Sequence, residues 1–328
     1  MGSVKDLELL QKAYENRPGR GRFNFSDRYS VFDWGEMPDH IPGKGLALAL
    51  MSAFNFERLA EKGIRSHYIG IVDDQGKAIQ FTQTTDFESL TPVMEVEMSC
   101  VYRPTARENI DDNGNVSVEY DYSFFDVNRG NINNFLIPLE IITRNGLPKG
   151  SSVFPKLEKA KALPEGQREA ALQKIYDKLG VKSEPKPGDM LPQPVLMYTT
   201  KLEEGDRSVS NEEAYWISGL TREGFAGLEA MNQAVNDYVS GRAKETGLAP
   251  NWDFKTEMAW DDGLKLVDVI GTLDENRFAN TSKEFMRQWY KENQPEFEKA
   301  CQEYKKTGSR WQDRCPTKPI NLPGELTT

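Results

Sequence analysis

The sequence predicts an α+β fold, in which short antiparallel strands and longer helices follow one another along the chain. Residues 67–103 contain two runs of alternating apolar and polar side chains separated by polar turns, a pattern typical of strands. Residues 224–244 instead repeat apolar side chains every three or four positions, which indicates an amphipathic helix. Asp262 and Gly263 lie between two further alternating runs and predict a β-hairpin.

The length of 328 residues favours two domains, which we place at residues 1–104 and 105–328. The first is expected to be a small β-rich domain with a turn and a helix at residues 41–63. Residues 105–134 are polar and rich in turn formers, so they are expected to be an insertion at the start of the second domain. Further along we expect a strand at 136–143, a helix at 157–179 closed by Gly180, an extended segment at 191–201, a helix that Asn211 caps and starts, and a final helix at 282–304.

Composition excludes several classes of partner. The chain has 51 acidic and 41 basic side chains, and the resulting charge of -10 opposes binding to nucleic acid or to anionic lipid. Its three cysteines lie far apart with no C-x-x-C spacing, so they indicate neither a disulfide framework nor a zinc site. No apolar stretch approaches the ~20 residues of a membrane span. We therefore expect a cytoplasmic protein whose partners are small molecules, and the sequence leaves open whether it forms a homo-oligomer.

Charged residues at alternate positions of the predicted hairpin are candidates for phosphate chemistry. Asp253, Lys255 and Glu257 should project from one face of a strand, with Asp268 on the facing strand. Glu257 and Asp268 could hold Mg²⁺ against ATP phosphates, and Lys255 could neutralise a phosphate oxygen. A solvated hairpin face is the alternative that this spacing alone does not exclude.

Two arginine-containing segments could bind anions. Arg144 follows an apolar strand and precedes glycines and Ser151, which are the parts of a phosphate-binding turn. Arg277 ends a polar run and could hold a carboxylate or phosphate through two hydrogen bonds. An ordinary loop and a loop salt bridge are the respective alternatives. The sequence lacks the G-x-S-x-G elbow of a serine hydrolase.

Taken in order, these segments resemble the SAICAR synthetase family, whose members use ATP to join an aminoimidazole carboxylate to aspartate. The blocks that carry the resemblance are SDRYSVFD (26–33), IPGKG (41–45), SAFNFERL (52–59), IPLEIITRN (137–145), TTKLEEGD (199–206), DFKTE (253–257) and the segment 268–277. The resemblance implies a small N-terminal antiparallel domain, a larger C-terminal α/β portion similar to ATP-grasp enzymes, and ATP in the cleft between them.

The resemblance also implies roles for individual residues. ATP would bind at Gly2, Val4, Lys5, Lys255, Glu257 and Asp268, with Mg²⁺ on Glu257 and Asp268. The catalytic residues would be Asp253, Lys255, Asp206 and Asp274, three of them acids near the incoming amine. Substrate would bind at Ser30, Asp33, Lys44, Arg144, Ser151, Lys201 and Arg277. The carboxylate would first become an acyl phosphate, because a bare carboxylate is a poor electrophile.

The chain departs from the family pattern in three places. Ser3 stands at the first basic position of the opening glycine-containing segment, and Val269 stands where a second acid usually follows Asp268. Residues 105–134 are longer than in the common bacterial form, as in a divergent archaeal-type branch. Two alternatives therefore stay open: a related ATP-dependent ligase for another heteroaromatic carboxylate, and a nucleotide sensor or scaffold without turnover.

Overall fold

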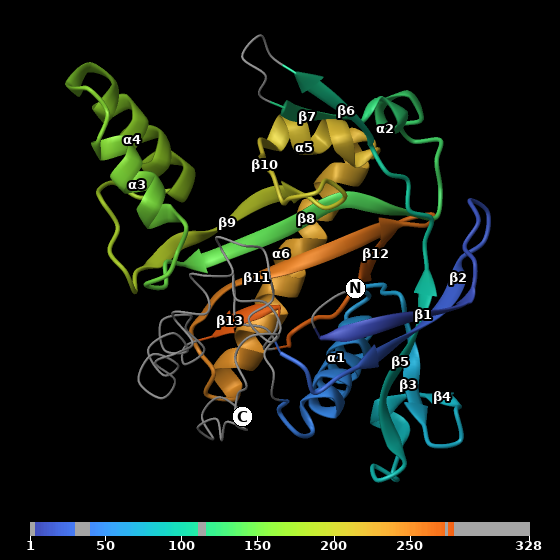
Figure 1. Ribbon diagram of the computed structural model, residues 1–328. Helices are drawn as coiled ribbons and strands as arrows, with labels where there is room; N and C mark the ends of the chain where they lie inside the picture. Colours follow the sequence, from blue (N-terminus) through green and yellow to red (C-terminus); the bar gives the residue numbers. More distant parts are fainter. Residues whose placement is uncertain (1–3, 30–39, 111–115, 273–274, 279–328) are drawn as a thin grey trace, which may run out of the picture.

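The chain folds into two antiparallel sheets with helices packed against them (Figure 1), which confirms the α+β prediction. The computed structural model describes residues 4–29, 40–110, 116–272 and 275–278. Within these ranges, no helix is long and apolar enough to cross a membrane. The boundary at residue 104 stays a prediction; the strands of the first sheet lie between Lys5 and Met98.

The first sheet has the strand order β1-β2-β5-β3-β4. Its elements are β1 (Lys5–Gln11), β2 (Gly19–Phe25), β3 (Tyr68–Asp73), β4 (Ala78–Ile79), β5 (Leu90–Met98) and the short 3-10 helix η2 (Phe81–Gln83). Helix α1 (Lys44–Ala60) packs on this sheet and buries Phe56 and Leu59, as the turn-helix pattern at 41–63 predicts. The Asp27 carboxylate accepts hydrogen bonds from the amides of Gly43 and Gly45, so it satisfies donors at the start of α1.

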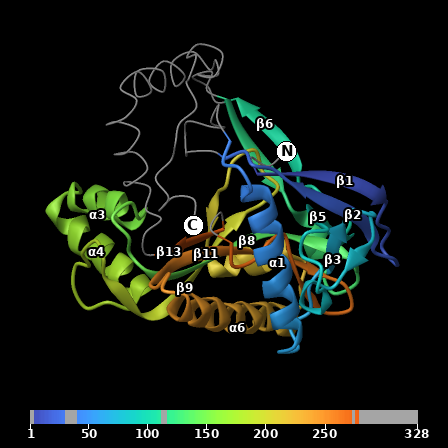
Figure 2. The ribbon, with the colours of Figure 1, turned by 90° about the horizontal axis from the view of Figure 1, so that it is seen from below.

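The second sheet has the order β10-β9-β8-β11-β12, with β13 also paired to β11. Its strands are β8 (Phe135–Gly146), β9 (Met190–Thr200), β10 (Ser208–Val209), β11 (Asn251–Trp260), β12 (Leu264–Val267) and β13 (Asn276–Phe278). Helix α6 (Arg222–Glu245) covers one face of this sheet (Figure 2). Thr256 donates to the buried Asn232 of α6 at 2.5 Å, so Thr256 faces the helix. Because strand side chains alternate, Asp253, Lys255 and Glu257 project from the opposite face.

Two helical predictions need correction. The single helix expected at 157–179 is two helices, α3 (Val153–Lys161) and α4 (Glu165–Leu179), separated at Pro164, whose ring nitrogen has no hydrogen to continue the helical bonding. Helix α5 (Asn211–Ser218) is capped by Ser210, which accepts from the Glu213 amide, rather than by Asn211. The expected termination at Gly180 is confirmed, and residues 282–304 lie outside the described residues.

The segment 105–134 has structure of its own. It contains the hairpin β6 (Thr105–Ile110) and β7 (Val116–Asp121), followed by the short helix α2 (Ser123–Val127). In Figure 1 the hairpin lies beside α5 and β10, at the edge of the second sheet. This segment therefore forms a small substructure next to the β10 edge of the second sheet.

The two sheets contact each other through backbone and side-chain hydrogen bonds. The amide of His67 donates to the carbonyl oxygen of Leu266 at 2.9 Å, and the Leu266 amide donates to Arg65 at the same distance. Asn55 of α1 donates to the carbonyl oxygen of Ile270 at 3.0 Å. The segment that follows β12 is thus held between the second sheet and the elements of the first.

Candidate active site

Two arginines flank one aspartate at one end of the exposed face of β11. Asp253 is the cross-strand neighbour of Arg144 on β8 and of Arg277 on β13. Both oxygens of the Asp253 carboxylate accept hydrogen bonds from Arg277, and a guanidinium nitrogen of Arg144 lies 3.8 Å away. Asp253 is 4% exposed. The structure therefore brings together three predicted site residues, with Asp253 as the shared partner of the two cations.

Arg144 has an unused hydrogen-bond donor at this end of the strand. Its Nη1 atom donates to the Ser151 hydroxyl at 2.5 Å, which orients the guanidinium. Its Nε atom is buried and has no hydrogen-bond partner among the described residues. A buried unpaired donor is costly, and more so when it is charged. A phosphate or carboxylate oxygen would supply the missing acceptor, so this end suits an anionic group.

A second charged cluster lies farther along the same face. Glu257 of β11 is the cross-strand neighbour of Glu140 on β8. Lys201, just after β9, pairs with Glu257 at 2.5 Å and with Glu140 at 3.3 Å. Lys255 pairs with Glu140 at 2.9 Å. Glu257 is four positions along the extended strand from Asp253, so their Cα atoms are about 13 Å apart along β11.

The first sheet completes this second cluster. Lys5 at the start of β1 pairs with Asp268 at 2.5 Å, although the two residues belong to different sheets. Asp268 comes directly after β12 instead of on it, and its φ of 66° is in the left-handed region. Left-handed backbone at a non-glycine residue is strained and is kept only where the surroundings hold it. In this backbone conformation the Asp268 carboxylate pairs with Lys5.

The second cluster contains more carboxylates than lysines. Burial, and then the negative charge of Asp268, raises the pKa of Glu257, although Lys201 opposes the shift. Burial and Asp268 likewise raise the pKa of Glu275, against the effect of Lys5. Four carboxylates (Glu140, Glu257, Asp268 and Glu275) thus share three lysines (Lys5, Lys201 and Lys255). A further cation would relieve this repulsion.

Mg²⁺ fits this arrangement as an ion held jointly by protein and nucleotide. The described residues contain no group of three or more His, Cys, Asp or Glu side chains arranged to hold a metal. Mg²⁺ commonly takes only one or two carboxylates together with phosphate oxygens and water. Glu257 and Asp268 could provide those two, since each raises the energy of the other's negative charge.

The remaining predicted residues divide into described and undescribed ones. Val4 packs against the core, and its carbonyl oxygen accepts from the Ser26 amide. Lys44 begins α1 and donates to the Arg28 carbonyl oxygen at 3.2 Å, and Asp206 lies near Lys255. Gly2, Ser30, Asp33 and Asp274 lie outside the described residues. Val269 is 3% exposed, so the residue that replaces the second acid is in the core.

Glu140 and Glu275 belong to the site although the sequence patterns did not single them out. The sequence does contain one indication of the role of Glu140, because it is a charged residue within the apolar run of β8. Glu275 follows Asp274 in a polar segment where its sequence position does not distinguish it from a loop acid. Its burial arises only when the segment folds against β11, where the Lys255 amide donates to its carbonyl oxygen.

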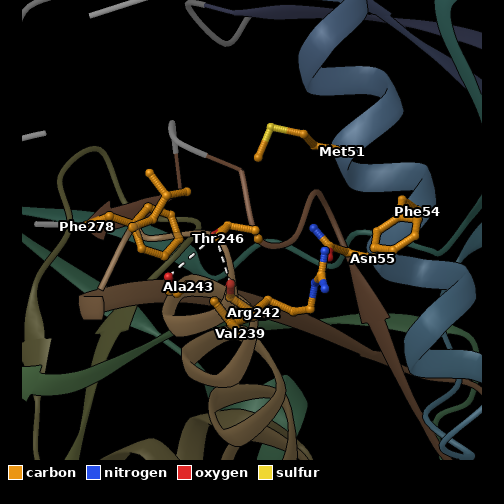
Figure 3. A pocket seen from close by; sticks show the side chains of 10 residues that line it. Met51, Phe54, Asn55, Val239, Arg242, Ala243, Thr246 and Phe278 are labelled. Atoms are coloured by element: carbon orange, nitrogen blue, oxygen red, sulfur yellow. Dashed lines mark hydrogen bonds between the residues drawn. The ribbon is translucent and has the colours of Figure 1, made fainter. Parts of the chain in front are cut away.

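A cavity of about 210 Å³ lies between α1 and α6 (Figure 3). Its lining is mainly apolar and includes Met51, Phe54, Val239 and Phe278. It contains none of the predicted site residues. Among the residues that line it only Arg242 is charged, and Arg242 pairs with Glu245, so the two charged clusters described above lie outside this cavity.

Two antiparallel sheets and a face of paired carboxylates, lysines and arginines have the chemistry of an enzyme that acts on anionic substrates. A family model described as SAICAR synthetase matches residues 10–306. A protein of Archaeoglobus fulgidus, provisionally named phosphoribosylaminoimidazole-succinocarboxamide synthase, is 41% identical over 300 residues, which cover 90% of this chain and 80% of that protein. The chain belongs to the SAICAR synthetase family.

Solved structures show the same fold. One, the SAICAR-synthase from Saccharomyces cerevisiae complexed with SAICAR, is 20% identical with a TM-score of 0.58, and the match covers all of this chain and 88% of that one. Another, a SAICAR synthetase in complex with ADP, is 19% identical with a TM-score of 0.53, and 88% of each chain is covered. At this identity the likeness concerns the fold alone.

Proposed function

We propose that this protein ligates L-aspartate to 5-amino-1-(5-phosphoribosyl)imidazole-4-carboxylate and so makes the succinocarboxamide SAICAR, ADP and phosphate. The observation that carries the proposal is the joint presence, on one face of β11, of a carboxylate–lysine cluster and an arginine pair. The first has the chemistry of nucleotide phosphates and the second that of a ribotide phosphate or a carboxylate. Membership of the family and the ADP bound in one of the similar structures support ATP as co-substrate.

The carboxylate–lysine cluster serves phosphoryl transfer. When bound, Mg²⁺ on Glu257 and Asp268 would neutralise the nucleotide phosphates. Lys5 and Lys255 add positive charge beside it, and this charge stabilises the transferring group. A carboxylate oxygen of the imidazole substrate attacks the γ-phosphorus, the bond to the bridging oxygen breaks, and ADP leaves. The substrate then carries a good leaving group.

The arginine pair serves the acyl-transfer step through orientation. Arg144, Ser151 and Arg277 hold an anionic group of the ribotide, and Asp253 keeps both guanidinium groups in place. The aspartate amine attacks the activated carbonyl carbon, phosphate departs, and the nitrogen loses a proton. In this proposal Asp206 and Asp274 are the acids that interact with that amine. Lys44, Lys201, Ser30 and Asp33 complete the substrate contacts, and Gly2 and Val4 the nucleotide contacts.

Location and partners follow from the same proposal. All three substrates are soluble metabolites, and the scattered cysteines suit a reducing compartment, so we place the enzyme in the cytoplasm.

Product analysis tests the proposed function. Purified protein is incubated with the imidazole carboxylate, L-aspartate and Mg-ATP, and the product is identified by mass spectrometry. The expected result is one ADP per SAICAR, with no ADP when the imidazole carboxylate is left out and no continued turnover when L-aspartate is left out. Turnover with a different heteroaromatic carboxylate and none with the named one would assign a related ligase, and tight ATP binding without turnover would contradict the ligase function.

A further inference from the structure

The insertion at 105–134 contacts a loop of the candidate site. This loop, residues 201–207, joins β9 to β10 and is called the β9–β10 loop below; it carries Lys201 and Asp206. The Tyr120 hydroxyl accepts a hydrogen bond from the Glu204 amide at 2.9 Å. The Tyr122 hydroxyl donates to the Glu203 carboxylate at 3.0 Å. Two tyrosines at the end of β7 therefore hold two successive residues of the loop.

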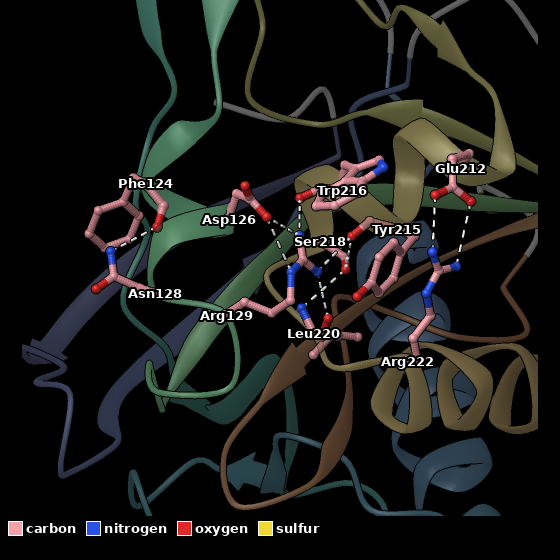
Figure 4. Close-up of polar contacts among 10 residues, drawn as sticks. All are labelled: Phe124, Asp126, Asn128, Arg129, Glu212, Tyr215, Trp216, Ser218, Leu220 and Arg222. Atoms are coloured by element: carbon pink, nitrogen blue, oxygen red, sulfur yellow. Dashed lines mark hydrogen bonds and ion pairs between the residues drawn. The ribbon is translucent and has the colours of Figure 1, made fainter.

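The insertion that carries these tyrosines is itself firmly anchored (Figure 4). The Arg129 guanidinium donates to the carbonyl oxygens of Tyr215, Trp216 and Leu220 at 3.1, 2.8 and 2.6 Å. These carbonyl groups lie at and just beyond the end of α5, where helical acceptors lack partners within the helix. Arg129 also pairs with Asp126 at 3.0 Å. Arg129 thus attaches the insertion to the C-terminal end of helix α5.

The other contacts of the β9–β10 loop hold its two ends. The Thr200 amide donates to the carbonyl oxygen of Arg207 at 2.9 Å, which closes the loop where it joins the sheet. Arg207 pairs with Glu203 at 3.0 Å and with Glu213 of α5 at 2.5 Å. The Glu203 side chain is only 4% exposed. The Tyr120 bond to Glu204 lies between these ends, and it comes from the insertion alone.

The inner side of the β9–β10 loop faces the charged cluster. Lys201 contacts Glu257 and Glu140, as described above. Burial lowers the pKa of Lys255, but the carboxylates of Glu140 and Asp206 more than offset this effect. The negative charge of Asp206 thus acts on the ammonium group of Lys255. The Lys201 amide donates to the carbonyl oxygen of Pro138 at 3.2 Å, so a displacement of the middle of the loop would shift Asp206 more than Lys201.

We propose that Tyr120 and Tyr122 are positioning residues that set the affinity for the amine substrate by holding the β9–β10 loop in place. This inference rests on the proposed function, in which Asp206 lies near the incoming amine. It assigns a role to the insertion: a support, anchored on α5, for one wall of the amine site. The nucleotide contacts of Lys5 and Asp268 come from other elements and do not depend on this support.

The double variant Tyr120→Phe/Tyr122→Phe tests the proposal, because it removes both hydroxyls and keeps both rings. We expect the KM for L-aspartate to rise roughly tenfold from the loss of two hydrogen bonds. The kcat and the KM for ATP should stay close to wild type. Tyr238→Phe is the matched control, since its hydroxyl donates to Asn55 between α6 and α1 at 2.8 Å, and it should leave the KM for L-aspartate unchanged.

A second measurement keeps the test independent of the double variant's folding. Hydrogen exchange of the Glu204 amide should become faster in the single variant Tyr120→Phe and stay unchanged in Tyr238→Phe. An unchanged KM for L-aspartate in the double variant, or a parallel change in kcat and in all KM values, would overturn the proposal. Failure of the proposed function is distinguishable, because then the wild-type protein would itself show no aspartate-dependent turnover.

Discussion

The Nε2 atom of His67 lies 2.9 Å from the backbone carbonyl oxygen of Asp268. A carbonyl oxygen can only accept, so Nε2 carries the hydrogen and donates it. The imidazole packs between the rings of Phe23 and Phe56, at centroid distances of 5.6 and 5.5 Å. A residue that precedes β3 of the first sheet thus holds the strained residue after β12, whose carboxylate pairs with Lys5.

The burial of His67 predicts a pH dependence of stability. Burial lowers the pKa of His67 from 6.5 to about 4, although the bond to Asp268 opposes the shift. Below pH 6.5 this histidine is protonated in the unfolded chain, whereas in the folded protein it becomes protonated only near pH 4. The neutral, buried His67 therefore stabilises the folded protein fully above pH 6.5. As the pH falls from 6.5 to about 4, the free energy of unfolding decreases by about 3 kcal/mol.

Urea unfolding of the wild type and of His67→Gln between pH 4 and 7.5 measures this contribution. The glutamine amide can still donate to Asp268 but does not titrate, so the difference in unfolding free energy between the two proteins should change with pH in that window. If the two stability curves run parallel, His67 is not the group responsible.

Removing one acid of the metal pair should weaken Mg²⁺ binding and slow turnover. For Glu257→Gln or Asp268→Asn we expect kcat to fall roughly 100- to 1,000-fold, as when a preorganised charge is removed from a transition state. Titration of activity with Mg²⁺ should show a raised requirement for the metal. The control is Glu184→Gln, which removes an exposed partner of Lys161 far along the sequence from the site. Equal Mg²⁺ requirements in wild type and both site variants would contradict the assignment.

Asp253→Asn should destabilise the protein as well as impair it. The carboxylate compensates two buried or half-buried arginines, and its removal leaves Arg144 and Arg277 without their shared anion. The cost of leaving a buried charge unpaired is about 3–5 kcal/mol. Asp121→Asn is the control, because its pair with Arg107 is exposed and worth less than about 1 kcal/mol. Chemical unfolding compares them, and similar losses in the two variants would refute this role of Asp253.

Gly271 is required where the segment after β12 passes α1. Its φ is 69°, and a Cβ there would collide with the side chain amide of Asn55. We expect Gly271→Ala to cost about 2 kcal/mol from backbone strain and this contact. Gly241→Ala in α6 meets nothing within 4 Å and should instead stabilise the helix by about 0.5–1 kcal/mol. Thermal unfolding measures both variants, and a change of Tm in the same direction for Gly271→Ala and Gly241→Ala would contradict this expectation.

The sequence predicted those features that depend on local patterns. The hairpin of β11 and β12 was accessible because strand alternation flanks Asp262 and Gly263, which adopt φ values of 51° and 142°. The face shared by Asp253, Lys255 and Glu257 follows from the same alternation. The charge pattern alone does not predict the break between α3 and α4, because the pattern continues across Pro164. A proline at this place is nevertheless typical of the first residues of a new helix.

Long-range contacts could not be predicted from local patterns. The pairing of Lys5 with Asp268 depends on how the two sheets dock, and the contact of Tyr120 with the β9–β10 loop depends on where the insertion packs. The resemblance of the blocks placed Lys5 and Asp268 in one site without giving their contact. Glu140 and Glu275 acquire their roles from burial, which composition does not reveal.

The most direct test of the central claim follows one oxygen atom through the reaction. The imidazole carboxylate is labelled with ¹⁸O, and the phosphate released during ligation to L-aspartate is analysed by mass spectrometry. An acyl phosphate intermediate predicts one labelled oxygen in each phosphate, because the attacking carboxylate oxygen leaves with the phosphoryl group. SAICAR formation with unlabelled phosphate would contradict the proposed phosphorylation of the carboxylate at the β11 face.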